Sequence, residues 1–145
     1  MKLVNMLIIL GLMMTVGSIS AQNKTSNSNA GVKKVDGVHM TFDSENINIG
    51  KVTKGDVKKF DFVFTNTGTD VIEIDVAAGC DCTTLDYPRH KIKPGDKGVI
   101  HVSFDSGKKD ASEVIDVDIY LKNLNPKTGQ RILKVVKYSY DLLKK

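Results

Sequence analysis

The stretch Lys59-Phe60-Asp61-Phe62-Val63-Phe64-Thr65-Asn66 carries an aromatic residue at every second position from 60 to 64. Successive side chains of a β-strand point to opposite faces, so Phe60, Phe62 and Phe64 would share one face and Lys59 and Asp61 the other. Aromatic residues also suit a pleated, half-buried surface. We therefore expect a strand here, with its aromatic face at the centre of the hydrophobic core.

The same period of two recurs on both sides of this stretch. Clusters of Gly, Pro, Asn and Asp separate the runs at short intervals, as turns do. About seven strands and no helical period predict an all-β fold, an antiparallel β-sandwich. The apolar positions assigned to the inward faces are Met40, Phe42, Ile47, Ile49, Ile72, Ile74, Val76, Ile100, Val102, Phe104, Ile115, Val117, Ile119 and Leu121.

The last segment, Arg131 to Tyr140, is less regular than the others. Leu133 and Val135 compete with Val136, Tyr138 and Tyr140 for the inward face. A strand with two apolar faces is poorly specified by period alone. We expect this segment to be an edge strand.

The start of the chain resembles a processing signal. Lys2 precedes an apolar run from Leu3 to Val16, which ends in small residues up to Ala21. This arrangement is typical of a secretory signal peptide and is too short and too interrupted for a membrane-spanning helix. We predict a signal peptide over residues 1–21 and export of the mature chain, without membrane insertion, to the periplasm or the extracellular space.

Residues 22–35 are rich in Asn, Ser, Thr, Lys and Gly and contain almost no apolar residue. Such a composition cannot bury enough surface to offset the entropy of ordering it, so we expect a flexible polar tether. We expect residues 36–145 to form one domain, because a segment of this length can bury a single hydrophobic core.

The net charge of +4 raises the question of nucleic-acid binding. A nucleic-acid footprint would be a concentrated basic face, often with stacking aromatics. The lysines are instead scattered among aspartates along the chain, as at Lys58, Lys59 and Asp61. This pattern indicates a solvated surface of mixed charge, and we predict no nucleic-acid partner.

Cys80 and Cys82 are the only cysteines and stand one residue apart in Gly79-Cys80-Asp81-Cys82-Thr83. By strand parity both thiols would face inward as small apolar fillers. In an extended segment their Cα atoms would lie about 6.6 Å apart, so a disulfide needs a tight turn. Export to an oxidising compartment favours that bridge. Buried thiols, a labile disulfide, and a metal or redox site all stay open.

A metal site would use the two thiolates for a soft ion such as Cu(I) or Zn, with an imidazole to complete the shell. His90 is the candidate imidazole, although it lies eight residues past Cys82. His39 and His101 have no ligand spacing to the pair either, and a surface histidine is the simpler interpretation of all three. We assign no metal ligand and predict no cofactor.

The sequence offers little for catalysis. No serine lies in a Gly-x-Ser-x-Gly elbow, and no glycine-rich loop could cradle a phosphate. The acidic residues alternate outward along the expected strands, so no pair stands out as general acid and base. We predict that the protein is not an enzyme and has no catalytic residues.

Four motifs in order carry a resemblance to a known family. The motifs are Phe62-Val63-Phe64-Thr65-Asn66-Thr67-Gly68, Gly79-Cys80-Asp81-Cys82-Thr83, Ile92-Lys93-Pro94-Gly95-Asp96-Lys97-Gly98 and Ile100-His101-Val102-Ser103-Phe104-Asp105. Together they resemble the exported bacterial domain of unknown function 1573 (DUF1573), over roughly residues 38–123. The resemblance implies an immunoglobulin-like sandwich similar to the major sperm protein. It implies no established activity, and Asp81 stands where that family usually has Gly.

These observations lead to two functional hypotheses. The first is a non-catalytic binding or scaffold protein of the cell envelope, whose partner is another envelope protein or a surface polymer. One route to such binding is the addition of a partner's strand to an exposed edge, with the segment 131–140 as the expected edge. The alternative is soft-metal (copper or zinc) or thiol-redox handling through Cys80 and Cys82.

Overall fold

The computed structural model describes residues 34–143. The predicted signal peptide and all but the last two residues of the predicted tether lie outside the described residues. Of those two, Val35 forms an isolated bridge to Gly68, and its N–H donates to the Thr67 carbonyl at 2.9 Å. Within the described residues, no helix is long and apolar enough to cross a membrane.

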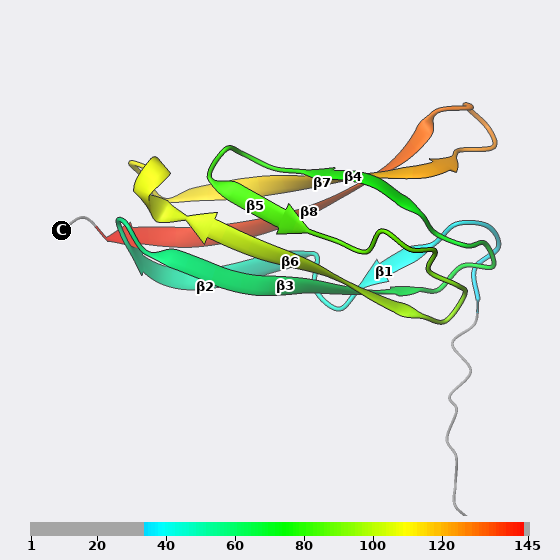
Figure 1. Ribbon diagram of the computed structural model, residues 1–145, viewed down its shortest axis with the longest axis horizontal. Helices are drawn as coiled ribbons and strands as arrows, with labels where there is room; N and C mark the ends of the chain where they lie inside the picture. Colours follow the sequence, from blue (N-terminus) through cyan, green and yellow to red (C-terminus); the bar gives the residue numbers. More distant parts are fainter. Residues whose placement is uncertain (1–33, 144–145) are drawn as a thin grey trace, which may run out of the picture. The chain divides into compact units, whose positions relative to one another are not determined.

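Two four-stranded sheets make up the domain (Figure 1). One sheet has the strand order β1-β3-β6-β5, and the other has the order β2-β8-β7-β4. A short 3₁₀ turn, η1, follows β6. The elements are β1 (Met40–Phe42), β2 (Asn46–Thr53), β3 (Val57–Asn66), β4 (Ile74–Ala78), β5 (Thr83–Asp86), β6 (Lys97–Asp105), η1 (Ser106–Lys108), β7 (Glu113–Leu124) and β8 (Arg131–Leu143).

The predicted all-β immunoglobulin-like sandwich is confirmed. One pairing departs from the antiparallel expectation, because β2 runs parallel to β8. The chain passes from β1 in one sheet to β2 in the other and returns to the first sheet with β3. This excursion lays β2 beside the last strand in the same direction, whereas all the other paired strands run antiparallel.

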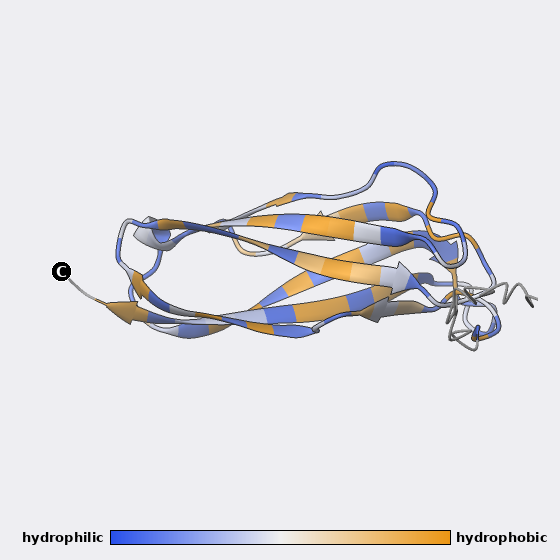
Figure 2. Ribbon diagram, turned by 90° about the horizontal axis from the view of Figure 1, so that it is seen from below, coloured by the Kyte–Doolittle hydropathy of each residue, from blue (hydrophilic) through white to orange (hydrophobic). Residues whose placement is uncertain are grey.

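The core lies between the sheets and is built on the aromatic face of β3. Figure 2 shows apolar and polar residues alternating along the strands. Phe62 and Phe64 are fully buried, as predicted, while Phe60 is only half-buried and packs its ring edge against Tyr138. Phe104 contacts the rings of Tyr138 and Tyr140 at centroid distances of 5.5 and 4.5 Å. In the absence of tryptophan, this aromatic cluster joins the two sheets.

Val76 does not face the core, which corrects the parity assigned to the run from Ile72. The pairing of β4 with β7 shifts between Ile74 and Val76, where two steps along β4 match one step along β7. Such a bulge moves the following side chains to the opposite face. Val76 is therefore 39% exposed, and Ala77 packs against the core in its place.

The prediction that residues 131–140 form an edge strand is wrong for the second part of β8. Lys137–Ser139 pairs with β2 on one side and with β7 on the other, and 141–143 pairs with β2 alone within the described residues. Val136, Tyr138 and Tyr140 take the inward face, which makes this part of β8 a central strand. Within the described residues, 131–136 pairs with β7 alone.

Candidate functional site

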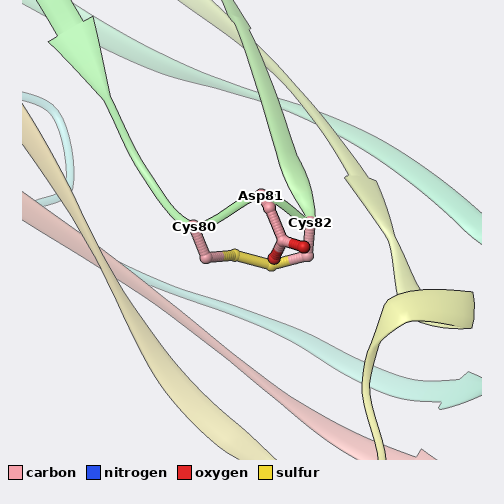
Figure 3. Close-up of side chains that lie close together, drawn as sticks. All are labelled: Cys80, Asp81 and Cys82. Atoms are coloured by element: carbon pink, nitrogen blue, oxygen red, sulfur yellow. A yellow bond between two sulfur atoms is a disulfide. The ribbon is translucent and has the colours of Figure 1, made fainter.

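The cysteine pair lies in the turn that carries the chain from β4 in one sheet to β5 in the other. The N–H of Thr83 donates to the carbonyl of Cys80 at 2.9 Å and closes the turn. This turn brings the two Cα atoms to 5.2 Å, closer than an extended strand would, and a disulfide joins Cys80 to Cys82 (Figure 3). The bulge in β4 explains why strand parity could not place the pair, since it shifts the register before Gly79.

Two hydroxyl groups lie beside the bridge. Cys82 is buried, whereas Cys80 is only half-buried. Thr83 Oγ1 lies 3.3 Å from the Sγ of Cys80 and 3.6 Å from that of Cys82. The hydroxyl of Tyr138, from the facing sheet, lies 2.6 Å from Thr83 Oγ1 and 3.9 Å from Cys82 Sγ. The inner side of the disulfide is therefore polar, although it borders the core.

Charged groups surround this site on its outer side. Asp81 is exposed, and its carboxylate lies within 4.8 Å of both sulfur atoms. Lys108 donates to the backbone carbonyl of Asp81 at 2.6 Å. Burial raises the pKa of Tyr138 above its ordinary value, and the hydrogen bond with Thr83 opposes that effect. The tyrosine hydroxyl thus stays protonated at neutral pH and can donate a hydrogen bond.

The histidines do not join the cysteines. Within residues 34–143, the one group of potential metal ligands comprises Cys80, Asp81 and Cys82, without His90. His101 is exposed and bonds Asp61 at 2.7 Å, and the ring of His39 lies 2.6 Å from Thr67 Oγ1. Sulfur atoms joined in a disulfide offer no thiolate ligands. Copper or zinc binding therefore stays a prediction for the reduced protein.

A second candidate site lies on β8, in the first part of the segment that the sequence suggested as an exposed edge. β2 pairs with Lys137–Leu143 only, beginning where the Lys137 N–H donates to the Glu45 carbonyl. Arg131–Val136, the first part of β8, pairs with β7 on one side. Within residues 34–143, no strand pairs with it on the other side. We call Arg131–Val136 the open half-edge.

Beside the open half-edge, the surface is hollowed. The hollow has a volume of about 360 Å³ and separates the start of β8 from the segment that leads into β1. We call it the edge groove. In Figure 1, the orange tip of the β7–β8 hairpin lies at the end of the domain away from β2, whose pairing with β8 begins only at Lys137. Its walls include Asp36, Val38, Asp70, Leu124, Ile132 and Lys134.

Sequence reasoning missed the edge groove because it depends on which strands pair. The only signal in the sequence is a difference in length, since the run at 46–53 is shorter than the apolar segment that begins at 131. A length difference does not say that the two segments are neighbours. The register between them comes from the fold alone.

The family model described as Protein of unknown function (DUF1573) matches residues 40–136, about two thirds of the chain. The chain belongs to this family. The resemblance seen in the sequence motifs is thereby confirmed, and the match identifies no catalytic family. No curated protein matches the chain.

Several solved structures share the fold. A protein of unknown function from Porphyromonas gingivalis aligns with a TM-score of 0.59 at 19% identity, over 80% of this chain and 51% of that one. The ASH/PapD-like domain 7 of human CEP192 aligns with a TM-score of 0.57 at 9% identity, over 92% of this chain and 99% of that one. The VesB protease of Vibrio cholerae aligns with a TM-score of 0.55 at 11% identity, over 72% and 31%.

These identities are low, so the likenesses show the fold alone. The chain spans about half the length of the Porphyromonas gingivalis protein that it matches and under a third of the protease.

Proposed function

We propose that this DUF1573 protein is an exported, non-catalytic binding module of the cell envelope, which takes up an extended segment of another envelope protein at the open half-edge. One observation carries the proposal. Within the described residues, Arg131–Val136 has a strand partner on one side only, although Lys137–Ser139 of the same strand is paired on both sides. Export rests on the predicted signal peptide, and non-catalytic action rests on the lack of a catalytic motif in the sequence.

An open strand edge is a template for another strand. Its unpaired N–H and C=O groups can bond to an extended peptide, and main-chain bonds of this kind supply affinity in strand addition. A segment placed beside Arg131–Val136 would continue the line of β2 and complete the sheet. Every second side chain of that segment would point into the edge groove, because side chains alternate along a strand.

The walls of the edge groove indicate the chemistry of the partner segment. Val38, Leu124 and Ile132 offer apolar surface. Asp36 and Asp70 form no ion pair within the described residues, and Lys134 is the one basic residue on these walls. Two carboxylates against one ammonium favour a cationic ligand group. We infer a partner segment that alternates apolar residues and carries one Lys or Arg side chain toward the groove.

Site-specific photocross-linking in the producing cells tests this proposal. A benzophenone amino acid replaces Lys134, at the edge groove, or Lys137, on the doubly paired part of the same strand. We expect one discrete adduct with another envelope protein from position 134 and none from position 137. Mass spectrometry of the adduct should locate the cross-link in an extended segment with alternating apolar residues and a basic residue.

A pair of variants makes the test specific. Ile132→Lys removes apolar surface from the groove and adds a positive charge that repels a cationic ligand group, and Leu133→Lys adds the same charge on the outer face of the same strand. We expect the first change to abolish the adduct from position 134 and the second to leave it, with both proteins folded by circular dichroism. Three outcomes would contradict the proposal: an adduct with a second copy of the chain, an internal cross-link to residues before Lys34, or a partner that is a polysaccharide.

A further inference from the structure

The disulfide between Cys80 and Cys82 presents its two sulfur atoms unequally to solvent. The bridge lies in the turn between β4 and β5, which are both outermost strands of their sheets. Cys80 is half-buried, whereas Cys82 is 2% exposed and belongs to the core. A thiol that arrives from outside therefore reaches the Sγ of Cys80 before that of Cys82.

The hydroxyl pair behind the bridge can stabilise charge on sulfur. Thr83 Oγ1 and the Tyr138 hydroxyl oxygen share one hydrogen bond, which uses one of their two hydroxyl hydrogens. The other hydrogen is free to point at sulfur, from Tyr138 to Cys82 or from Thr83 to either cysteine. A donated hydrogen bond favours the thiolate form of cysteine, so this arrangement suits a sulfur that leaves with an electron pair.

We propose that the Cys80–Cys82 bridge is a thiol–disulfide exchange site that oxidises a dithiol. A thiolate of the dithiol attacks the Sγ of Cys80, a new S–S bond forms, and the bond between Cys80 and Cys82 breaks. The electron pair passes to Cys82 Sγ, which accepts a hydrogen bond from the hydroxyl pair and takes a proton from water. The second thiolate of the dithiol then attacks the dithiol sulfur that is bonded to Cys80. A disulfide forms within the dithiol, the mixed-disulfide bond breaks, and Cys80 leaves as a thiolate that takes a proton from water.

The dithiol thus loses two electrons and becomes a disulfide, while Cys80 and Cys82 become two thiols. This chemistry uses none of the residues of the edge groove, so it stands apart from the proposed binding function. Tyr138 acts in it directly, because its hydroxyl lies beside the leaving sulfur of Cys82.

Asp81 controls access to the bridge. Its carboxylate lies within 4.8 Å of both sulfur atoms, and Figure 3 shows it projecting on the same side as the bridge. The attacking group in thiol–disulfide exchange is an anionic thiolate, which this carboxylate repels. Asp81 therefore slows exchange with anionic thiols, and removal of its charge accelerates the reaction.

Dithiothreitol, a small dithiol, is the probe for this proposal. The folded protein is mixed with excess dithiothreitol without denaturant, samples are alkylated with iodoacetamide, and mass spectrometry follows the reduced fraction. We expect a rate proportional to the dithiothreitol concentration, with an unchanged β-sheet signal in circular dichroism. A rate that does not depend on its concentration would overturn the proposal, because reduction would then wait for unfolding of the domain.

Three variants assign the roles of the neighbouring groups. We expect Asp81→Asn to react about three- to tenfold faster than the wild type and Tyr138→Phe about threefold or more slower. Tyr140→Phe is the matched control, because the Tyr140 hydroxyl is buried and has no hydrogen-bond partner among residues 34–143. Its rate should equal that of the wild type. Equal rates for all four proteins would contradict the roles of Asp81 and Tyr138.

The order of attack is tested with single cysteines. Cys82→Ser leaves the thiol of Cys80, and Cys80→Ser leaves that of Cys82. Glutathione disulfide should form the mixed disulfide with Cys80 about tenfold faster than with Cys82 because Cys82 is buried. A faster reaction at Cys82 would reverse the proposed order and overturn the mechanism.

Discussion

Tyr138 and Tyr140, on the inner face of β8, are two tyrosines that the fold buries in the core. Burial raises the pKa of Tyr138 and of Tyr140 above the ordinary value of 10.0, and Glu113 adds to the effect on Tyr140. A buried phenol resists ionisation because the charged form loses its hydration.

This shift predicts a loss of stability at alkaline pH. The folded state holds the phenol protons more tightly than the unfolded state, so the contribution is fully present below pH 10 and is lost as the pH rises further. Urea unfolding between pH 8 and pH 11 should show a decline that is smaller in the Tyr138→Phe/Tyr140→Phe double variant. Parallel declines in the two proteins would contradict this role of the tyrosines.

At the scale of elements, the contact between β3 and β6 depends on one glycine. Gly98 of β6 lies opposite Phe64 of β3, and a Cβ atom on Gly98 would overlap the phenylalanine ring. Phe64 is fully buried, so its ring has little room to move. The glycine of this strand is therefore required by packing and not by an unusual backbone angle, since its φ is not positive.

Replacement of this glycine should destabilise the domain. We expect Gly98→Ala to lower the free energy of unfolding by about 1–3 kcal/mol, the usual cost of overpacking a core. Ser103→Ala, on the outward face of the same strand, should change it by no more than about 0.5 kcal/mol. Addition of Phe64→Leu to Gly98→Ala should regain part of the loss. If Gly98→Ala unfolds at the same urea concentration as the wild type, the close packing of β3 on β6 is wrong.

The elements also show which features a sequence can predict. The period of two placed Phe62 and Phe64 in the core because alternation is a local property of a strand. It misplaced Val76 because a bulge adds a residue that no local pattern marks. It also misjudged β8, whose neighbours come from distant segments of the chain.

The candidate sites differ in the same way. The sequence shows the cysteine pair, and strand geometry indicates that a disulfide between its members requires a tight turn. The turn is present, and the disulfide forms. The hydroxyl groups behind it were not visible, because Tyr138 lies 55 residues from Thr83 in sequence. The sequence did not reveal the edge groove, since its walls come from segments far apart in the chain, near Val38, Asp70 and Ile132.

Across the domain, β8 has a neighbouring strand on both sides along only part of its length. The strands of the sheet β2-β8-β7-β4 are staggered: β2 flanks β8 from Lys137 onward, whereas β4 flanks β7 at Asp118–Leu121, and within the described residues no strand covers the other side of Arg131–Val136. This difference along a single strand makes one region suited to strand addition and the other region part of the core. The proposed binding function depends on it more than on any single side chain.

Amide hydrogen exchange, measured residue by residue with nuclear magnetic resonance, tests whether one side of Arg131–Val136 is unpaired. Amides of an antiparallel strand point alternately to its two sides, so only alternate amides of Arg131–Val136 bond to β7. We predict fast exchange at the other amides of Arg131–Val136 and slow exchange at successive amides of Lys137–Ser139, which pairs with both β2 and β7. Uniformly slow exchange across both regions would show that the open half-edge is already paired, and it would contradict strand addition at Arg131–Val136.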